Sequence, residues 1–193
     1  MAQQRRHKAY FFTATLVALC LATSACVTIH PPARVMPVER TAAAFEVVFS
    51  PSRKAEDAIV RFIGEARKSV HVAAYAFTSK EIALALLAAK DRGLDVRIVV
   101  DKSQAAGRYS AATFLANHAV AVRVDGEYQL QHQKVVIVDG VSIETGSYNF
   151  TASARDRNSE NVLIIRDAPE LAARYEANWE KMWGESVMME RRY

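Results

Sequence analysis

Two short runs rich in β-branched residues, 135–138 and 141–145, flank the dipeptide Asp139-Gly140. An Asp-Gly pair between two such runs is a strong signal for a β-hairpin with a two-residue turn. The turn decides which residues of the two strands lie opposite one another, and side chains along a strand alternate between its two faces. This one feature therefore predicts the local geometry of the whole segment around it.

The same turn predicts where the polar side chains beyond the apolar part of the hairpin lie. With Asp-Gly as the turn, Lys134 is opposite Thr145 and His132 is opposite Ser147. Opposed residues share a face of the sheet. His132, Lys134 and Ser147 are therefore expected to converge on one side, with Asn149 in the same parity, unless a bulge intervenes.

A histidine and a lysine two residues apart on an apolar strand carry the chemistry. Such a lysine is costly to bury unless it meets a negative ligand. An ammonium can neutralise phosphoryl oxygens while an imidazole acts as nucleophile or proton donor. His132 and Lys134 therefore predict attack on a phosphodiester. Asp139 and Gly140, at the turn, and Gly146, in the second strand, are expected to have structural roles.

The segment follows the pattern H-x-K-x4-D-x6-G-S-x-N. Its fixed positions are His132, Lys134, Asp139, Gly146, Ser147 and Asn149. This pattern resembles the signature of the phospholipase D superfamily at every fixed position. The resemblance covers residues 45–193 and extends to the small bacterial endonuclease Nuc, which carries one such motif per chain. Further matching stretches are residues 74–78, 88–93, 144–151 and 157–161.

The resemblance implies a phospholipase D-like α/β/α sandwich and hydrolysis in two steps through a covalent phosphohistidine. It implies that Lys134, Ser147 and Asn149 bind the phosphoryl oxygens. It also places Glu160 beside the nucleophile His132, where a carboxylate would hold the imidazole in the attacking tautomer. Neither a metal nor a cofactor is implied, since lysines supply the positive charge.

The number of motifs predicts an oligomer. The reaction needs two His-x-Lys units, and none of the other histidines has a lysine two residues on; they are His7, His30, His71 and His118. One chain therefore offers half a site. We expect a homodimer with one shared active site at an isologous contact. His71 and His118 are assigned structural roles.

The motif leaves the substrate open, because nucleic acids and phospholipids both offer a phosphodiester. A non-specific endonuclease is the first interpretation, since the compact chain leaves little room for loops that shape a lipid pocket. The alternative is hydrolysis of phospholipid headgroups to phosphatidic acid, and a third is an inactive module that binds phosphates. Taken singly, Ser147 and Asn149 would be ordinary turn residues and Glu160 a surface carboxylate.

Apolar periodicity predicts strands alternating with helices, which indicates an α/β sandwich with a mixed sheet. Beyond the hairpin, strands are expected at residues 45–50, 70–77, 94–100, 120–124 and 161–165. Helices are expected after Ser52, after Ser79, at residues 109–117 and from Pro169. Tyr175, Trp179 and Trp183 are expected to pack the last helix on the sheet.

The N-terminal region predicts export. Residues 1–25 combine a basic start, an apolar stretch at 10–21 and small residues before Cys26, as in a signal peptide. Cys26 is either the lipidated residue of a lipoprotein or the first residue after ordinary cleavage, and an uncleaved anchor is a third option. Residues 26–44 are expected to be a tether and 45–193 the catalytic domain. We therefore expect a periplasmic, membrane-anchored or secreted protein.

Bulk charge does not argue for a nucleic-acid partner. The chain has 25 Lys+Arg and 21 Asp+Glu, but three of the basic residues lie in residues 1–25. Residues 26–193 therefore have a net charge of only +1. Any basic groove must therefore be local. One of the two cysteines, Cys20, also lies within the signal, so the mature domain has no pair to oxidise and depends on its core for stability.

Overall fold

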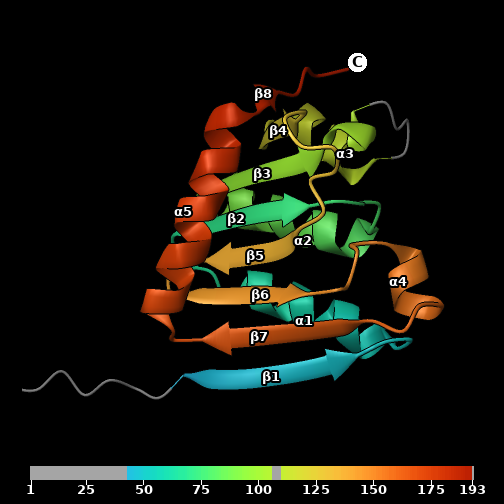
Figure 1. The fold of residues 1–193 in the computed structure, drawn as a ribbon, viewed down its shortest axis with the longest axis vertical. Coiled ribbons are helices and arrows are strands. Elements are labelled where there is room, and N and C mark those ends of the chain that lie inside the picture. Colours follow the sequence, from blue (N-terminus) through green and yellow to red (C-terminus); the bar gives the residue numbers. More distant parts are fainter. Residues whose placement is uncertain (1–42, 106–109, 193) are drawn as a thin grey trace, which may run out of the picture. The chain divides into compact units, whose positions relative to one another are not determined.

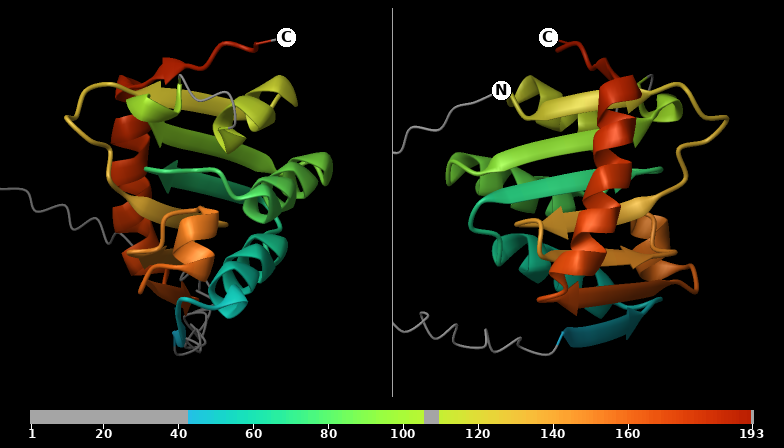
Figure 2. Two further views of the ribbon diagram at one scale, coloured as in Figure 1. Left: turned by 90° about the vertical axis from the view of Figure 1, so that its right-hand side faces the viewer. Right: turned by 60° about the vertical axis from the view of Figure 1, so that its left-hand side comes forward.

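The computed structural model describes residues 43–105 and 110–192. These residues form one eight-stranded sheet of strand order β1-β7-β6-β5-β2-β3-β4-β8. Helices cover both faces: α1, α2 and α3 lie on one side and α5 crosses the strands on the other (Figures 1 and 2). The predicted α/β sandwich with a mixed sheet is therefore confirmed.

The strands are β1 (Ala44–Phe49), β2 (Ser69–Ala74), β3 (Asp95–Asp101), β4 (Ala121–Asp125), β5 (Lys134–Val138), β6 (Ser142–Gly146), β7 (Asn161–Arg166) and β8 (Val187–Met188). The helices are α1 (Arg53–Gly64), α2 (Lys80–Asp91), the short 3-10 helix η1 (Lys102–Gln104), α3 (Ala111–Asn117), α4 (Ala152–Asp156) and α5 (Pro169–Glu185). Strands β2, β3 and β4 are parallel, and the other neighbouring strands are antiparallel.

Local sequence signals account for most of the helix boundaries. Ser52 and Ser79 cap α1 and α2 as expected, each accepting a hydrogen bond from a backbone N–H of the first turn. Pro169 opens α5. The short helix α4 and the two-residue strand β8 were not predicted, because neither is long enough to show a hydrophobic period.

Two apolar cores fill the space between the layers. The larger core lies between the sheet and α1 to α3, and the smaller one lies beneath α5. Strand β2 is buried on both faces, as its continuous apolar run predicted. Trp179 is buried in the smaller core, and Tyr175 and Trp183 pack against it, so the predicted packing face of the last helix is confirmed.

Several predictions fall outside the part of the chain that the structure describes. These are the signal peptide 1–25, Cys26, nearly all of the tether 26–44, and Tyr109 at the start of the third predicted helix. The last tether residue, Ala44, is the first residue of β1. Within the described residues, none of the helices has the length and apolar character needed to cross a bilayer.

The hairpin turn forms, but its register differs from the prediction by one residue. Asp139 and Gly140 both have positive φ, 56° and 67°, and the Val141 N–H donates to the Val138 carbonyl at 3.1 Å. The ladder then pairs Val138 with Ser142, so Val141 is an extra residue. Its carbonyl accepts a hydrogen bond from the Ala168 N–H at 2.8 Å, a tertiary contact that the two strands alone could not reveal.

This shift corrects the predicted pairing. Thr145 lies opposite Val135 rather than Lys134. The expected opposition of His132 and Ser147 is therefore wrong, because His132 precedes the first residue of β5 and Ser147 follows the last residue of β6. The polar residues must be brought together in another way, by the ends of neighbouring strands.

Asp139 anchors the hairpin to the segment before β2. Its carboxylate accepts hydrogen bonds from the backbone N–H groups of Arg67, Lys68 and Ser69 at 2.7–3.1 Å. Partial burial raises the pKa of Asp139, but the three N–H groups outweigh that effect and the pKa lies below its usual value of 3.8. Asp139 therefore acts on the turn, at the far end of β5 from His132.

We expect Asp139→Ala to lower the free energy of unfolding by about 2 kcal/mol, because three N–H groups lose a charged acceptor and alanine disfavours positive φ. Asp139→Asn is the matched control, since it keeps one acceptor oxygen and tolerates this backbone conformation, and it should lose less. Urea unfolding measures both.

The stabilisation by Asp139 should also depend on pH, because the pKa of its carboxyl is lower in the folded state than in the unfolded state. The free energy of unfolding of wild type should exceed that of Asp139→Asn by its full amount above about pH 4, and this difference should disappear as the pH falls further. An advantage that is independent of pH would contradict this role.

Candidate active site

The predicted site residues gather at one end of the sheet, where β2 and β6 end and β5 and β7 begin. These four strands are neighbours in the order β7-β6-β5-β2, and adjacent members run antiparallel. A strand that ends here therefore lies beside one that begins here. Residues that follow β2 and β6 are thus placed next to residues that precede β5 and β7, at the right-hand end of the sheet in Figure 1.

Lys134 and His132 are in direct contact at this end. The Lys134 Nζ lies 3.1 Å from Nδ1 and 3.2 Å from Nε2 of the His132 ring, and it donates to the His132 carbonyl at 2.8 Å. Lys134 is 5% exposed, whereas His132 is exposed. The arrangement offers an accessible imidazole with an ammonium held close to both of its ring nitrogens.

The electrostatics of Lys134 reflect this burial. Desolvation lowers the pKa of Lys134, and the nearby charge of Glu160 partly opposes that effect. A buried ammonium with one partial counter-charge gains strongly from an incoming anion. The site is therefore suited to a ligand that carries negative charge, such as a phosphoryl group.

Tyr75 is a part of this cluster that sequence reasoning missed. It directly follows β2, and its ring centroid lies 4.4 Å from that of His132 and 5.0 Å from the Lys134 Nζ. The face of an aromatic ring attracts a cation, so Tyr75 both orients the imidazole and stabilises the ammonium. The only hint in the sequence is a tyrosine at the end of an apolar strand, and hydrophobic periodicity alone assigns such a residue to the core.

Glu160 reaches the cluster from the position immediately before β7. Its Oε2 accepts a hydrogen bond from the Ser147 hydroxyl at 2.6 Å, and its Oε1 accepts one from the Asn158 amide at 3.0 Å. Among the described residues no hydrogen bond joins Glu160 to the His132 ring, so the tautomer-holding role stays a prediction. The observed carboxylate instead orients Ser147 and places negative charge near Lys134.

Backbone contacts hold Glu160 in place. The Ser50 hydroxyl accepts from the Glu160 N–H at 3.1 Å and donates to the Asn158 carbonyl at 3.0 Å. The Ser50 N–H donates to the Glu160 carbonyl at 3.0 Å. The end of β1 thus clamps the loop that leads into β7.

Gly146 is required by a close approach between β6 and β7. A Cβ atom at this position would lie 2.1 Å from the Asn161 carbonyl oxygen. The next residue, Ser147, exchanges two hydrogen bonds with Asn161: its N–H donates to the Asn161 carbonyl and its hydroxyl accepts from the Asn161 N–H, both at 3.1 Å. The glycine therefore lets Ser147 sit against the start of β7, beside Glu160.

Asn149 follows on the same loop. It is half-buried, and its Oδ1 is buried without a hydrogen-bond partner in the described part of the chain. The next residue, Phe150, forms a bridge with Phe77 beyond the end of β2. No hydrogen bond within the described chain links Asn149 to His132 or Lys134, so its phosphate-binding role stays a prediction.

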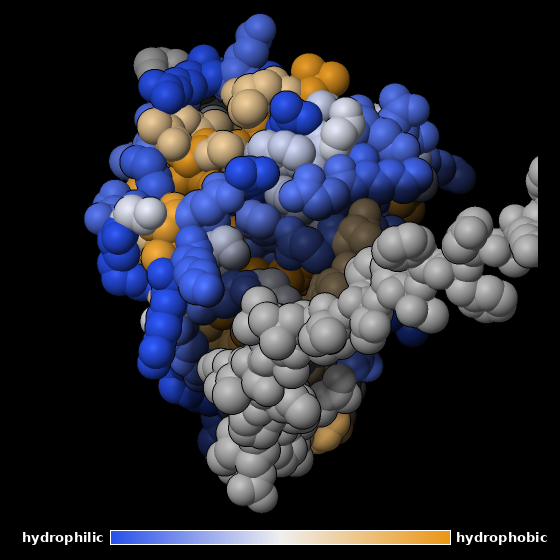
Figure 3. Space-filling model, turned by 90° about the vertical axis from the view of Figure 1, so that its left-hand side faces the viewer, coloured by the Kyte–Doolittle hydropathy of each residue, from blue (hydrophilic) through white to orange (hydrophobic). Residues whose placement is uncertain are grey.

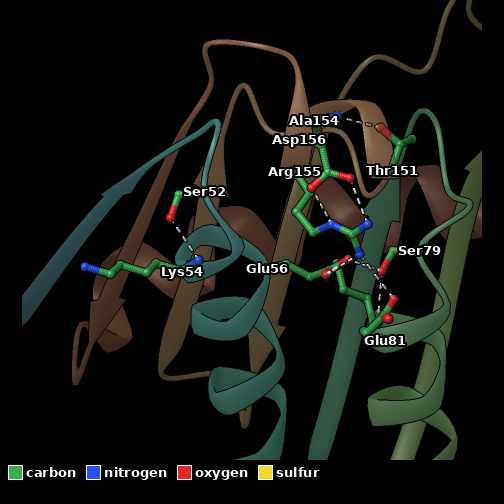
Figure 4. A network of polar contacts seen from close by, with 10 residues as sticks. Ser52, Lys54, Glu56, Ser79, Glu81, Thr151, Ala154, Arg155 and Asp156 are labelled. Carbon is green, nitrogen blue, oxygen red and sulfur yellow. Dashed lines mark hydrogen bonds and ion pairs between the residues drawn. The ribbon is translucent and has the colours of Figure 1, made fainter.

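A buried ion network supports the loop that carries Ser147 and Asn149. Glu56 of α1 is buried and accepts hydrogen bonds from the Ser79 hydroxyl at 2.7 Å and from Arg155 of α4 at 3.2 Å (Figure 4). Arg155 also binds Asp156 at 2.8 Å. The network ties α4 to α1 and to the cap of α2, which fixes the far end of the loop.

Comparison with known proteins identifies the family. A family model described as the PLD-like domain of cardiolipin synthase matches residues 59–183, well over half of the chain. The chain belongs to the phospholipase D superfamily. The predicted family is therefore confirmed.

The most informative relatives are of three kinds. The crystal structure of Nuc from Salmonella typhimurium, a phospholipase D family member, matches with a TM-score of 0.74 and 37% identity over 78% of this chain and 100% of Nuc. A phospholipase D of Rickettsia bellii is 38% identical over 131 residues, or 68% of this chain and 65% of the relative. The mitochondrial cardiolipin hydrolase of Xenopus laevis is 35% identical over 66% of this chain and 60% of its own length. The chain thus spans less than two thirds of the last two proteins.

Gly146→Ala should be strongly destabilising, by about 3 kcal/mol, because its Cβ would collide with a backbone carbonyl rather than with a movable side chain. Gly126→Ala is the matched control, since a Cβ there meets nothing within 4 Å. Thermal melts compare the two variants with wild type. Equal melting temperatures for both variants would show that β6 and β7 can separate at no cost.

Proposed function

We propose that this phospholipase D superfamily member is a phosphodiesterase that uses His132 as its nucleophile. The observation that carries the proposal is the buried Lys134 ammonium held against an exposed imidazole at an open end of the sheet. The ammonium would neutralise a non-bridging phosphoryl oxygen while an imidazole nitrogen attacks phosphorus. Positive charge preorganised in this way favours the transition state, where negative charge on those oxygens grows.

The reaction has two balanced steps. In the first, an imidazole nitrogen of His132 forms a bond to phosphorus, the bond to the leaving oxygen breaks, and a second imidazole gives that oxygen its proton. In the second, this imidazole takes a proton from water, the water oxygen bonds to phosphorus, and the N–P bond breaks. Asn149 is proposed to donate a hydrogen bond from its amide to a phosphoryl oxygen. Ser147 is proposed to do the same once its single hydroxyl proton, which Glu160 accepts in the structure, turns toward the substrate.

We infer that the second imidazole is His132 of a second copy of this chain. The other described histidines have structural surroundings: His71 stacks on Trp179, and His118 bonds the Phe114 carbonyl of its own helix. The loop before His132 exposes Tyr128 and Leu130, 39% and 52% respectively. Apolar side chains beside the site are what an isologous contact would cover.

The substrate that we favour is nucleic acid, cleaved as by a non-specific endonuclease. Support comes from the compact chain and from its match to the whole length of Nuc. The second candidate is a phospholipid headgroup, favoured by the names of the phospholipase D and cardiolipin hydrolase relatives. We further propose that the protein is exported and works in the periplasm, attached to a membrane through Cys26 or free.

A paired substrate assay tests the activity. The protein is incubated with plasmid DNA and, separately, with phosphatidylcholine vesicles, both in EDTA. We expect nicked DNA and intact lipid, and we expect His132→Ala to abolish turnover and Lys134→Ala to lower kcat by about 100-fold or more. Release of choline would support the second substrate. Binding of DNA without cleavage of either substrate, or wild-type rates in the His132 variant, would contradict the mechanism.

The dimer is tested by sedimentation together with activity. We expect the active species to sediment as a dimer, and specific activity to fall on dilution below its dissociation constant. Subunit mixing sharpens the test, because a dimer of one wild-type and one His132→Ala chain lacks one of the two imidazoles and should be inactive. A fully active monomer, or mixed dimers with half of the wild-type rate, would contradict a shared site.

A further inference from the structure

A second cluster of polar side chains lies between β2 and α5, away from the candidate active site. Its members are His71 of β2 and the α5 residues Glu176 and Glu180. His71 precedes Tyr75 by four residues, which places it about 13 Å back along the strand direction from the phosphate-cleaving end. The proposed phosphodiesterase mechanism uses none of these three side chains.

The cluster has the composition and proximity of a metal site. One ligand atom from each residue, a ring nitrogen or a carboxylate oxygen, lies within 4.8 Å of the others. Glu176 and Glu180 are separated by one helical turn, so both carboxylates project from the same face of α5. A histidine with two carboxylates is a donor set that suits Zn²⁺ and similar divalent ions.

The imidazole of His71 is held in one orientation. It stacks on Trp179 at 4.4 Å between centroids and 12° between planes. The Trp179 indole N–H donates to the Val72 carbonyl at 2.9 Å, which locks the supporting ring as well. With the ring fixed, Nδ1 faces the Glu176 carboxylate and Nε2 faces the opposite direction.

The environment of Nε2 is the second observation that points to a ligand. This buried atom has no hydrogen-bond partner among the described residues, but the Asp95 carboxylate stands 3.6 Å away. Arg97 holds Asp95 through contacts of 2.8 and 2.9 Å. Metal-binding histidines commonly present their second ring N–H to a carboxylate, which fixes the tautomer. Asp95 occupies that place.

A hydrogen bond to Glu176 satisfies only one of the two ring nitrogens of a neutral His71. If a neutral imidazole gave its one proton to Glu176, an unprotonated Nε2 would face the carboxylate of Asp95. If Nδ1 instead binds a cation, the proton moves to Nε2 and faces that carboxylate, and both glutamates become ligands. Three carboxylates and one arginine surround the ring, so the local charge also favours a cation.

We propose that His71, Glu176 and Glu180 bind a divalent transition-metal ion, with His71 using Nδ1 and water completing the coordination. The His71 side chain is 10% exposed and that of Glu176 is 25% exposed, while Glu180 is exposed and can turn inward. The surface on this side of the molecule is largely hydrophilic, with smaller hydrophobic patches (Figure 3). The ion would join α5 to the centre of the sheet and stabilise the fold without entering catalysis.

Zinc titration of the untagged full chain, after treatment with EDTA and dialysis, tests the site. We expect one saturable Zn²⁺ in calorimetry and a rise in melting temperature. Glu180→Gln should weaken this binding by about 10-fold or more, because it removes an exposed ligand that the fold does not need. Glu185→Gln is the matched control on the same helix, since Glu185 pairs with Lys181 instead, and should bind as wild type does.

Copper adds a readout that locates the ion. Both tryptophans of the chain lie in this region, with Trp179 stacked on His71 and Trp183 stacked on Trp179. Cu²⁺ in the site should therefore quench tryptophan fluorescence saturably, and Zn²⁺ should compete. No saturable binding, or equal affinity in wild type and Glu180→Gln, would overturn the proposal. EDTA should lower the melting temperature without stopping phosphodiester cleavage. The metal site and the proposed phosphodiesterase function can therefore be refuted separately.

Discussion

The burial of one ammonium group, that of Lys134, is the constraint on which the site depends. Removing a charged amine from water is unfavourable by several kcal/mol unless other groups compensate. Here the compensation is partial and comes from the Tyr75 ring, the carbonyl and ring nitrogens of His132, and the more distant charge of Glu160. An incoming anion would relieve the remaining deficit, and this is how we propose that the site binds a phosphoryl group. A fully paired lysine would stabilise the fold better and bind phosphate less well.

The pairing of β5 with β2 makes this burial possible. Lys134 is the first residue of β5 and lies opposite Ala74, the last residue of β2, so its stem enters the apolar layer while its amine stays at the rim. The antiparallel order of β2, β5, β6 and β7 then delivers Tyr75, Ser147 and Glu160 to the same rim. Each of these residues flanks a strand rather than lying within one. The rigid sheet thus positions groups that carry chemistry on short connecting segments.

Charged groups elsewhere in the fold serve to hold these segments in place. Asp139 anchors the turn at the far end of the hairpin through three backbone N–H groups. Glu56 and Arg155 secure α4, after the loop that carries Ser147. The proposed cation between β2 and α5 would add a third such clamp on the opposite face. Asp139 and the Glu56–Arg155 pair act on the framework, as the proposed cation would, and they leave the charge of Lys134 uncompensated.

The sequence by itself determined the family, the alternation of strands and helices, the tight turn at Asp139-Gly140 and the residues that carry the motif. These depend on local rules: the hydrophobic period, capping residues and the backbone preferences of single positions. Gly146 also belonged to the motif, but only the structure shows that its missing side chain makes room for the Asn161 carbonyl.

The tertiary structure alone decided how the motif residues meet. The extra residue Val141 shifts the hairpin register by one, and its carbonyl accepts a hydrogen bond from the backbone N–H of Ala168, just before α5. Tyr75 joins His132, and Glu160 orients Ser147, through contacts between strands that are distant in the sequence. Such contacts depend on how elements distant in the sequence pack together, and local sequence patterns do not predict that packing. The alternation of residues along a strand predicts which face of the sheet a side chain lies on, but only the packing of the strands and helices determines its contacts.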